Sequence, residues 1–278
     1  MLINGEPEER ISINDRGLLY GDGLFETIRV IQGRPVLWKK HFQRLLRGCS
    51  ALSIDISPDN VVRDLQKLLD LSPADGIVKI IISRGAGGRG YQPPENTTPT
   101  RILQFHALPA DLELQAEQGI KVMICRQTIG QGTLAGHKHL NRLEQVLAAR
   151  EITDGFTEGL MLNIDSELIE GTRSNLFIAR NSQLFTPDLR LSGVSGVMRE
   201  YLLEYLRAAG QVVSIEPIPL QSLYNADEAF LCNSVAGIWP IVRVQHTDAA
   251  YDFPIGPMTR LARSVKLADL AEPVPKTC

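Results

Sequence analysis

Strand-like segments come in clusters in this sequence, and helical segments lie between the clusters. The first cluster of strands ends with a strand-like run near His106, and an apolar run at 120–125 starts the pattern again. A doubly wound parallel sheet would instead require strands and helices that alternate one by one. The pattern therefore predicts two α+β domains, at 1–107 and 115–278, joined by a linker at 108–114.

The expected first domain contains strands and two helices. Strands are predicted where apolar residues alternate or run together, at 24–31, 77–83 and 101–106. Apolar spacing typical of a helix covers 39–52. A second helix is expected after Ser57, which suits the N-cap, because Pro58 then occupies the first helical position. A loop rich in glycine and proline, 84–99, separates the last two strands.

The expected second domain mixes short strands with longer helices. Its strands are predicted by short apolar runs, at 120–125, 159–164, 168–169, 175–179, 212–216 and 229–232. Its helices are predicted by amphipathic spacing, at about 139–154, 195–210 and 257–270. Gly210 is suited to end the second of these helices, because glycine readily adopts the left-handed conformation of a helix C-cap.

Charge and composition exclude several classes of protein. The formal net charge is -3, which leaves no basic field to attract nucleic acid or an anionic membrane. No apolar run approaches the ~20 residues that a bilayer-spanning helix needs. The acidic N-terminal segment lacks the pattern of a secretory signal peptide. We therefore expect a cytoplasmic protein that acts on a small molecule, with any anionic ligand held by a local cluster of donors.

The four cysteines do not form a recognisable framework. Cys49, Cys125, Cys232 and Cys278 are far apart and include no C-x-x-C pair. We expect neither a metal site nor structural disulfides, and reduced thiols are the plain interpretation. Cys125 and Cys232 lie in apolar runs and are expected to be packing residues.

Two polar motifs in the expected second domain are candidates for chemistry. Lys138 follows a glycine-rich loop, where its amine could form an imine if burial beside cations lowers its pKa. From position alone, a solvated lysine at a helix start is the simpler interpretation, because most lysines are surface residues. Glu170 lies in a turn where a carboxylate could keep a pyridine nitrogen protonated. The alternative for Glu170 is an ordinary polar hairpin turn.

Together, these motifs resemble fold-type IV pyridoxal-phosphate enzymes. Lys138 stands in K-x-L-N, and Glu170 follows 32 residues later in E-G-x-x-S-N-L-F. This group includes branched-chain aminotransferases, D-amino-acid aminotransferases and 4-amino-4-deoxychorismate lyases. The resemblance implies that Lys138 holds pyridoxal 5′-phosphate as a Schiff base and that Glu170 binds the pyridine nitrogen.

The resemblance covers nearly the whole chain, from Asn14 to the region of Pro240. It implies a smaller N-terminal α/β domain and a larger C-terminal domain with a mixed, barrel-like sheet and helices. It also implies a homodimer. These expectations come from the family and agree with the two α+β domains that the strand pattern predicts.

Three segments match the positions where the family binds the cofactor phosphate. Arg44 stands in H-x-x-R-L, and its guanidinium is suited to bidentate phosphate contact. Val197 and Met198 open a predicted helix, where the resemblance implies main-chain N–H donors. The hydroxyl of Ser234 aligns with a phosphate ligand, although its neighbour Asn233 has similar chemistry. The simpler alternatives are a solvent-facing arginine and a plain helix start.

Within this group, three features resemble the lyases. The sequence of 138–145, KHLNRLEQ, is similar to the lyase signature K-x-L-N-R-L-E-Q, and Leu143 stands where branched-chain aminotransferases carry tyrosine. Thr27 occupies the position of a threonine implicated in lyase catalysis. The loop sequence RGAGGRGY is similar to a lyase loop in which Arg89 and Tyr91 would bind the substrate. A strand-forming threonine and a flexible hairpin loop are the alternatives.

The resemblance therefore implies a lyase of folate biosynthesis that converts 4-amino-4-deoxychorismate to 4-aminobenzoate and pyruvate. Lys138 would remove the ring proton, and either Lys138 or Thr27 would protonate the departing enolpyruvate. A D-amino-acid or branched-chain aminotransferase is the alternative of the same fold. A non-catalytic protein that binds RNA through the Arg/Gly loop is a further alternative, but one such stretch in a net-acidic chain supports it poorly.

Overall fold

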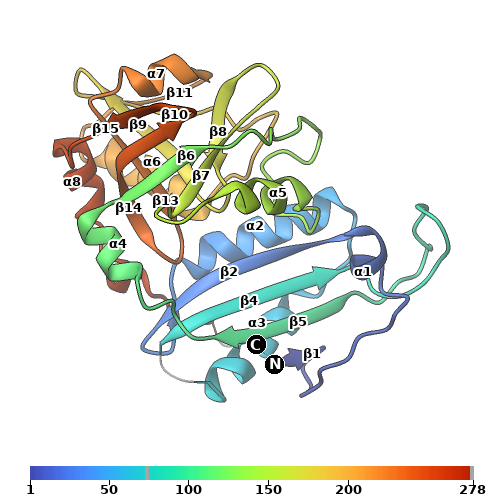
Figure 1. Ribbon diagram of the computed structural model, residues 1–278. Coiled ribbons are helices and arrows are strands. Elements are labelled where there is room, and N and C mark those ends of the chain that lie inside the picture. The colour runs from blue at the N-terminus through green and yellow to red at the C-terminus, as the bar shows by residue number, and fades with distance from the viewer. Residues whose placement is uncertain (73–74, 276–278) are drawn as a thin grey trace. The chain divides into compact units, whose positions relative to one another are not determined.

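In a computed structural model, which describes residues 1–72 and 75–275, the chain divides into two units (Figure 1). The first unit contains residues 1–108, the short segment 137–141 and the C-terminal segment from Leu267 onward. The second unit contains 109–136 and 142–266. The sequence predicted a single boundary, with a linker at 108–114. In the structure, the segment 137–141, which contains Lys138, also belongs to the first unit.

The first unit is built on an antiparallel sheet, in which the described strands follow the order β1-β5-β4-β2-β3. These strands are β1 (Leu2–Ile3), β2 (Gly23–Ile31), β3 (Arg34–Pro35), β4 (Gly76–Ser83) and β5 (Thr100–His106). The helices of this unit are α1 (Arg16–Tyr20), α2 (Trp38–Ala51) and α3 (Pro58–Asp70), and a 3₁₀ turn covers Leu267–Leu270. The three predicted strands and the helix predicted at 39–52 are confirmed to within two residues at each end, and the helix expected after Ser57 begins at Pro58.

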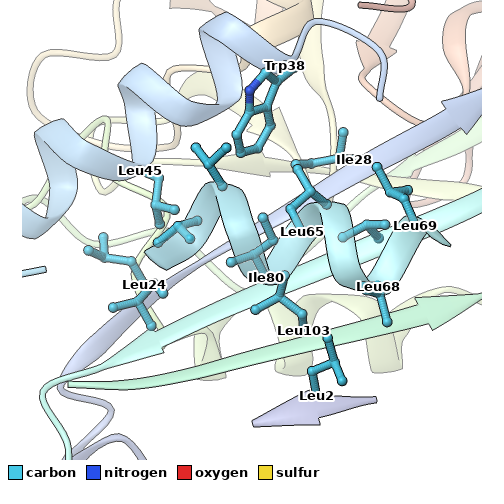
Figure 2. Close-up of a cluster of buried hydrophobic side chains, with 14 of the residues drawn as sticks. Leu2, Leu24, Ile28, Trp38, Leu45, Leu65, Leu68, Leu69, Ile80 and Leu103 are labelled. Atoms are coloured by element: carbon cyan, nitrogen blue, oxygen red, sulfur yellow. The ribbon is translucent and has the colours of Figure 1, made fainter. Parts of the chain in front are cut away.

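One face of this sheet is covered by α2 and α3, as Figure 2 shows. The alternation of β2 turns Leu24, Ile28 and Val30 toward the helices, where all three are buried. Leu45 of α2 and Leu65 of α3 pack against the same face. Burial of each such side chain contributes roughly 1.5–3 kcal/mol, so the alternation is sufficient to fix which face of the sheet meets the helices.

The N-terminus of α3 has the N-cap residue and the first-turn proline that the sequence predicted. Ser57 is the N-cap, and its hydroxyl accepts a hydrogen bond from the backbone N–H of Asn60 at 3.4 Å. Pro58 occupies the first turn, where a missing N–H removes no intrahelical bond.

The segment 137–141 lies along the edge of β2, where His139 forms an isolated bridge with Leu24. The N–H of Phe25 donates to the carbonyl of Lys138 at 2.9 Å, and the N–H of Leu140 donates to the carbonyl of Gly23 at 2.9 Å. The short strand β3 pairs only with the far end of β2, so the edge near Phe25 would otherwise present unpaired backbone groups. The prediction of a helix from about 139 was wrong for this reason, and α5 begins at Leu143.

The second unit contains a closed ring of strands. Its described strands run in the order β9-β13-β14-β6-β7-β8, and β8 pairs with β9 through Glu170 and Asn175. The sheet is mixed, because β6 is parallel to both β14 and β7 while the other neighbouring strands of the ring are antiparallel. The expected mixed, barrel-like domain is confirmed.

The elements of this unit have the following bounds. The strands are β6 (Ile120–Ile124), β7 (Glu158–Leu162), β8 (Glu167–Gly171), β9 (Asn175–Arg180), β10 (Gln183–Pro187), β11 (Val213–Glu216), β12 (Ile218–Pro219), β13 (Glu228–Asn233), β14 (Gly237–His246) and β15 (Ala249–Asp252). The helices are α4 (Leu112–Gln118), α5 (Leu143–Glu151), α6 (Val197–Ala208), α7 (Leu220–Tyr224) and α8 (Pro257–Arg263).

Several local predictions for this unit need correction. The expected linker contains the start of α4, and the helix expected at 257–270 is divided into α8 and the separate 3₁₀ turn. The strands β10, β12, β14 and β15 were not predicted. Gly210 does follow α6 in the left-handed conformation, with φ of 77°.

The cysteines behave as packing residues. Cys49, Cys125 and Cys232 are buried and not disulfide-bonded, and burial raises the pKa of each thiol to about 12. Cys278 lies outside the described residues. Across the part of the chain that the structure describes, there is no helix long and apolar enough to cross a membrane, and no cluster of His, Cys, Asp or Glu suited to a metal.

Candidate active site

Lys138 is held beside one face of β2. Its Nζ lies 4.4 Å from the centroid of the Phe25 ring, while its carbonyl is bound by the Phe25 N–H. Phe25 and Thr27 alternate with the buried residues of β2, so both side chains project from the face opposite the helices. The structure therefore brings Lys138 to the face of the sheet that carries Thr27. Lys138 therefore does not stand at a helix start, as the sequence predicted, but in a segment whose backbone is hydrogen-bonded to β2.

Arg44 belongs to a buried cluster on the other face of β2. Its Nε donates to Glu26 Oε1 at 2.8 Å, and one terminal nitrogen donates to Glu26 Oε2 at 2.5 Å. His41 Nδ1 lies 2.6 Å from Glu26 Oε2. All three side chains are buried. Arg44 is thus an oriented, buried residue and not the solvent-facing helix arginine of the simpler alternative.

The pKa values of Glu26 and His41 are both lowered in this cluster. Burial alone would raise the pKa of the Glu26 carboxyl, but attraction and hydrogen bonds from Arg44 and His41 outweigh it and lower this pKa to about 2. Burial lowers the pKa of His41, and the positive charges of Arg44 and Lys138 act in the same direction. We infer a carboxylate–guanidinium pair beside a neutral imidazole at pH 7. Among the described residues, the Nε2 atom of this imidazole has no hydrogen-bond partner.

The loop between β4 and β5 carries the two predicted substrate residues. Arg89 and Tyr91 are exposed, and the Tyr91 ring meets Tyr20 of α1 edge to face with centroids 5.6 Å apart. The loop begins at Arg84, whose side chain is buried and donates to both oxygens of Asp22. The loop therefore presents two side chains to solvent from an anchored base.

Glu170 lies near the end of β8, where the ring of strands closes, and is 4% exposed. Its Oε2 accepts a hydrogen bond from the backbone N–H of Val194 at 2.8 Å, and its Oε1 accepts one from Gln145 Nε2 at 3.5 Å. These donors orient the carboxylate. A side chain with this burial and these partners is not the solvated turn residue of the simpler alternative.

The segment before α6 is shaped by close packing. Asn175 Nδ2 donates to the carbonyl of Val194 at 2.9 Å, and a Cβ on Gly196 would lie 1.8 Å from Asn175 Oδ1. Only glycine fits here. Val197 and Met198 then form the first turn of α6, where backbone N–H groups have no acceptor within the helix. Gly196 offers no side chain to cap them, so this terminus is suited to an anion.

Ser234 and Asn233 are distinguished by their local bonding. Asn233 Oδ1 accepts hydrogen bonds from the N–H groups of Val235 and Ala236, at 2.9 and 2.7 Å. The side-chain amide oxygen of Asn233 therefore stabilises the turn after β13. The Asn233 side chain is thus engaged within the turn, and Ser234 directly follows it.

The predicted site residues are divided between the two units. Lys138, Thr27, Arg44, Arg89 and Tyr91 belong to the first unit, and Glu170, Val197, Met198 and Ser234 belong to the second. Sequence reasoning missed the residues that orient them, above all Glu26, Gln145 and Asn175. Glu26 had a readable signal, since a glutamate at a buried position of an alternating strand requires a partner.

The chain belongs to the amino-transferase class IV family, whose model matches residues 23–244. Within this family it is 39% identical to the aminodeoxychorismate lyase of Vibrio harveyi over 261 residues, which cover 93% of this chain and 96% of the relative. The crystal structure of 4-amino-4-deoxychorismate lyase from Pseudomonas aeruginosa superposes with a TM-score of 0.89 at 42% identity, covering 95% of this chain and 96% of that one.

Aminotransferases of the same fold are more distant. The branched-chain amino acid aminotransferase of Escherichia coli superposes with a TM-score of 0.83 at 25% identity, covering 97% of this chain and 93% of that chain. A hypothetical aminotransferase from Mycobacterium tuberculosis, solved in a PLP-bound form, shares the fold with a TM-score of 0.77 at 22% identity, covering 94% of this chain and 93% of that chain. The fold is therefore one in which a relative has been solved with this cofactor.

Proposed function

We propose that this chain is a pyridoxal-5′-phosphate-dependent lyase that converts 4-amino-4-deoxychorismate to 4-aminobenzoate and pyruvate. The observation that carries the proposal is the similarity to two aminodeoxychorismate lyases, at 39% and 42% identity over nearly the full length of each chain. The pairing of Lys138 with the strand that carries Thr27 supports it, because both residues are expected to act on the substrate.

The residues present fit the cofactor. The cluster at Arg44 contains a buried guanidinium and a buried imidazole nitrogen, Nε2 of His41, that lacks a partner among the described residues. The start of α6 offers N–H donors, and Glu170 offers an oriented carboxylate. When bound, pyridoxal 5′-phosphate supplies a carbonyl that condenses with amines and a protonated ring that accepts electrons.

Lys138 and Thr27 carry the proton transfers. Lys138 would hold the cofactor in the resting enzyme. Its Nζ, freed when the substrate amine takes its place, would accept the proton from the amine-bearing ring carbon of the substrate. The backbone bond to Phe25 fixes the position from which the lysine side chain starts. Return of a proton to the departing enolpyruvate is the task of Lys138 Nζ or the Thr27 hydroxyl, which projects from the same face of β2 as Phe25.

The remaining residues bind and orient. Arg44, the N–H groups of Val197 and Met198, and the Ser234 hydroxyl would bind the phosphate through charge-assisted and neutral hydrogen bonds. Glu170 would keep the pyridine nitrogen protonated. Arg89 and Tyr91 bind a carboxylate of the substrate.

The decisive experiment compares two products. Purified holoenzyme is given 4-amino-4-deoxychorismate, and pyruvate release is followed by coupled reduction with lactate dehydrogenase. The same preparation is given D-alanine or L-leucine with 2-oxoglutarate, and glutamate is measured. Pyruvate release without amino transfer supports the lyase. Amino transfer without pyruvate release from aminodeoxychorismate overturns it in favour of an aminotransferase of this family.

We also propose that the active protein is a homodimer. Leu143, Val146 and Leu147 lie on one face of α5 at i, i+3 and i+4 spacing, and all three are exposed. An apolar helix face of this kind is typical of a surface that another subunit covers. Light scattering of the purified protein tests this proposal, and a monomer at micromolar concentration would contradict it.

A further inference from the structure

Arg16 is a buried arginine that contacts the glycine-rich loop. It is 2% exposed, although arginine is seldom buried without charged or polar partners. Its Nη1 donates to the carbonyl of Gly90 at 3.1 Å, and its Nη2 donates to the carbonyl of Tyr91 at 2.8 Å. The guanidinium therefore holds the loop backbone at the two positions that directly follow Arg89.

One carboxylate fixes this guanidinium and the start of the loop together. Arg16 Nε donates to Asp22 Oδ2 at 2.9 Å, and Arg84 Nε donates to the same oxygen at 2.7 Å. Burial would raise the pKa of Asp22, but hydrogen bonds from Arg84 and Arg16 outweigh it and lower this pKa. Asp22 is thus ionised at neutral pH and connects the residue that begins the loop with the residue that holds its tip.

The loop needs such contacts to keep one conformation. Four of its glycines have positive φ values, Gly85 at 91°, Gly87 at 132°, Gly88 at 74° and Gly90 at 73°. Glycine loses the most backbone entropy on ordering, so a loop of this composition is fixed only where bonds offset that loss. The N–H of Arg16 binds the carbonyl of Gly85 at the base of the loop, and its side chain binds the tip.

These contacts leave the side chains of the loop directed outward. Arg16 binds main-chain carbonyls, while Arg89 and Tyr91 are exposed. The guanidinium also lies over the ring of Tyr20, 4.7 Å from its centroid, and that ring meets Tyr91 at its edge. Arg16 therefore orders the backbone around Arg89 without competing for the Arg89 side chain.

We propose that Arg16 is a positioning residue for substrate recognition, which fixes the loop conformation in which Arg89 binds a substrate carboxylate. This inference rests on the proposed function, because the carboxylate belongs to the proposed substrate. Arginine is suited to the role because its planar fork reaches Asp22, Gly90 and Tyr91 at once. A lysine in its place has a single nitrogen and cannot keep the three contacts in the same geometry.

The first test measures loop order without any substrate. Trypsin cleaves after exposed arginines in segments that open locally, and the bond between Arg89 and Gly90 lies beside the Arg16 contacts. We expect native holoenzyme carrying Arg16→Met to be cleaved at this bond about tenfold faster than wild type, or more, as followed by mass spectrometry. Arg16→Lys should fall between the two. The matched control is Arg10→Met, which changes an exposed arginine of the same N-terminal region.

The second test separates substrate binding from cofactor binding. Arg16→Met should raise KM for aminodeoxychorismate by about ten- to hundred-fold with a smaller change in kcat, and should leave the cofactor dissociation constant at the wild-type value. If Arg16 acts through Arg89, adding Arg89→Ala to Arg16→Met should cause little further loss, whereas independent residues would show additive losses. If Arg16→Met gives little folded protein, Arg16→Lys serves in the same cycle because it keeps a positive charge beside Asp22.

The outcomes distinguish this inference from the function on which it rests. Wild-type holoenzyme that releases no pyruvate overturns the proposed function. Wild-type activity with unchanged cleavage and unchanged KM in the Arg16 variants overturns only the positioning role. Faster cleavage with wild-type kinetics shows a structural contact alone and also overturns it. Additive losses in the double variant overturn the route through Arg89.

Discussion

The carboxylate of Glu26 accepts hydrogen bonds from two nitrogens of Arg44, at 2.8 and 2.5 Å, in the interior of the first unit. Two bonds to one carboxylate hold the guanidinium plane in a single orientation. Removing one partner of such a pair leaves a buried charge without its counter-ion, which is costly. The pair therefore has consequences for acid stability and for cofactor binding.

Glu26→Gln should change how stability depends on pH. A folded-state pKa lowered from 4.5 to about 2 corresponds to about 3 kcal/mol of stability. Because the folded pKa is the lower one, this contribution is present above about pH 4.5 and is lost as the pH falls toward 2. Urea unfolding between pH 7 and pH 2.5 should show a shallower fall in Glu26→Gln than in wild type. An equal fall in both proteins would contradict the pKa argument, and exposed Glu113→Gln is the control.

Arg44→Ala should weaken cofactor binding by about ten- to hundred-fold, because it removes a charge-assisted contact to phosphate. It also removes the guanidinium that pairs with the buried Glu26 carboxylate, so Arg44→Lys should be measured in parallel. Titration of the apoenzyme with pyridoxal 5′-phosphate, followed by visible absorbance, gives the affinity. Arg47→Ala changes an exposed arginine of the same helix and serves as the control. Equal affinity in Arg44→Ala and wild type would remove Arg44 from the phosphate site.

Local patterns predicted the parts of the fold that local forces determine. The alternation of β2, the apolar stripe of α2 and the cap at Ser57 are all readable over a few residues, and each is present. The position of Lys138 was not readable in this way, because it depends on pairing with Phe25, which is distant in the sequence. Helical spacing after 139 competed with this pairing, and the tertiary contact prevailed.

For the site residues too, local motifs were readable in the sequence and tertiary contacts were not. Family motifs selected Lys138, Glu170 and Arg44 as chemical groups, and their cofactor roles stay predictions. The residues that orient them belong to other elements, such as Glu26 on β2 for Arg44 and Gln145 on α5 for Glu170. No spacing rule connects these partners, since each pair meets only when the sheet and helix are assembled. The ring closes through the pairing of Glu170 with Asn175, and this pairing depends on strand register, which the local sequence pattern did not predict.

Lys138→Ala should abolish turnover and the visible absorbance of the lysine-bound cofactor while the protein stays folded. The matched control is Lys79→Ala, because the Lys79 Nζ also lies near the Phe25 ring, 5.5 Å from its centroid, against 4.4 Å for Lys138. Absorbance spectra and circular dichroism of both variants check this prediction. A wild-type spectrum in Lys138→Ala, or loss of that spectrum in Lys79→Ala, would show that Lys138 is not the residue to which the cofactor is attached.

Glu170→Gln should keep the fold and the cofactor but slow the reaction. The amide oxygen of glutamine can still accept the hydrogen bond that Val194 donates to Glu170 at 2.8 Å, and only the longer bond from Gln145, at 3.5 Å, is lost. A neutral amide cannot stabilise a protonated pyridine nitrogen as a carboxylate does, and loss of that charged contact corresponds to a decrease in kcat of about ten- to hundred-fold. Glu167→Gln, on the same strand, controls for loss of a carboxylate from β8. Steady-state kinetics with matched thermal unfolding curves make the comparison. Equal kcat values for Glu170→Gln and wild type would show that this carboxylate only orients the Val194 segment.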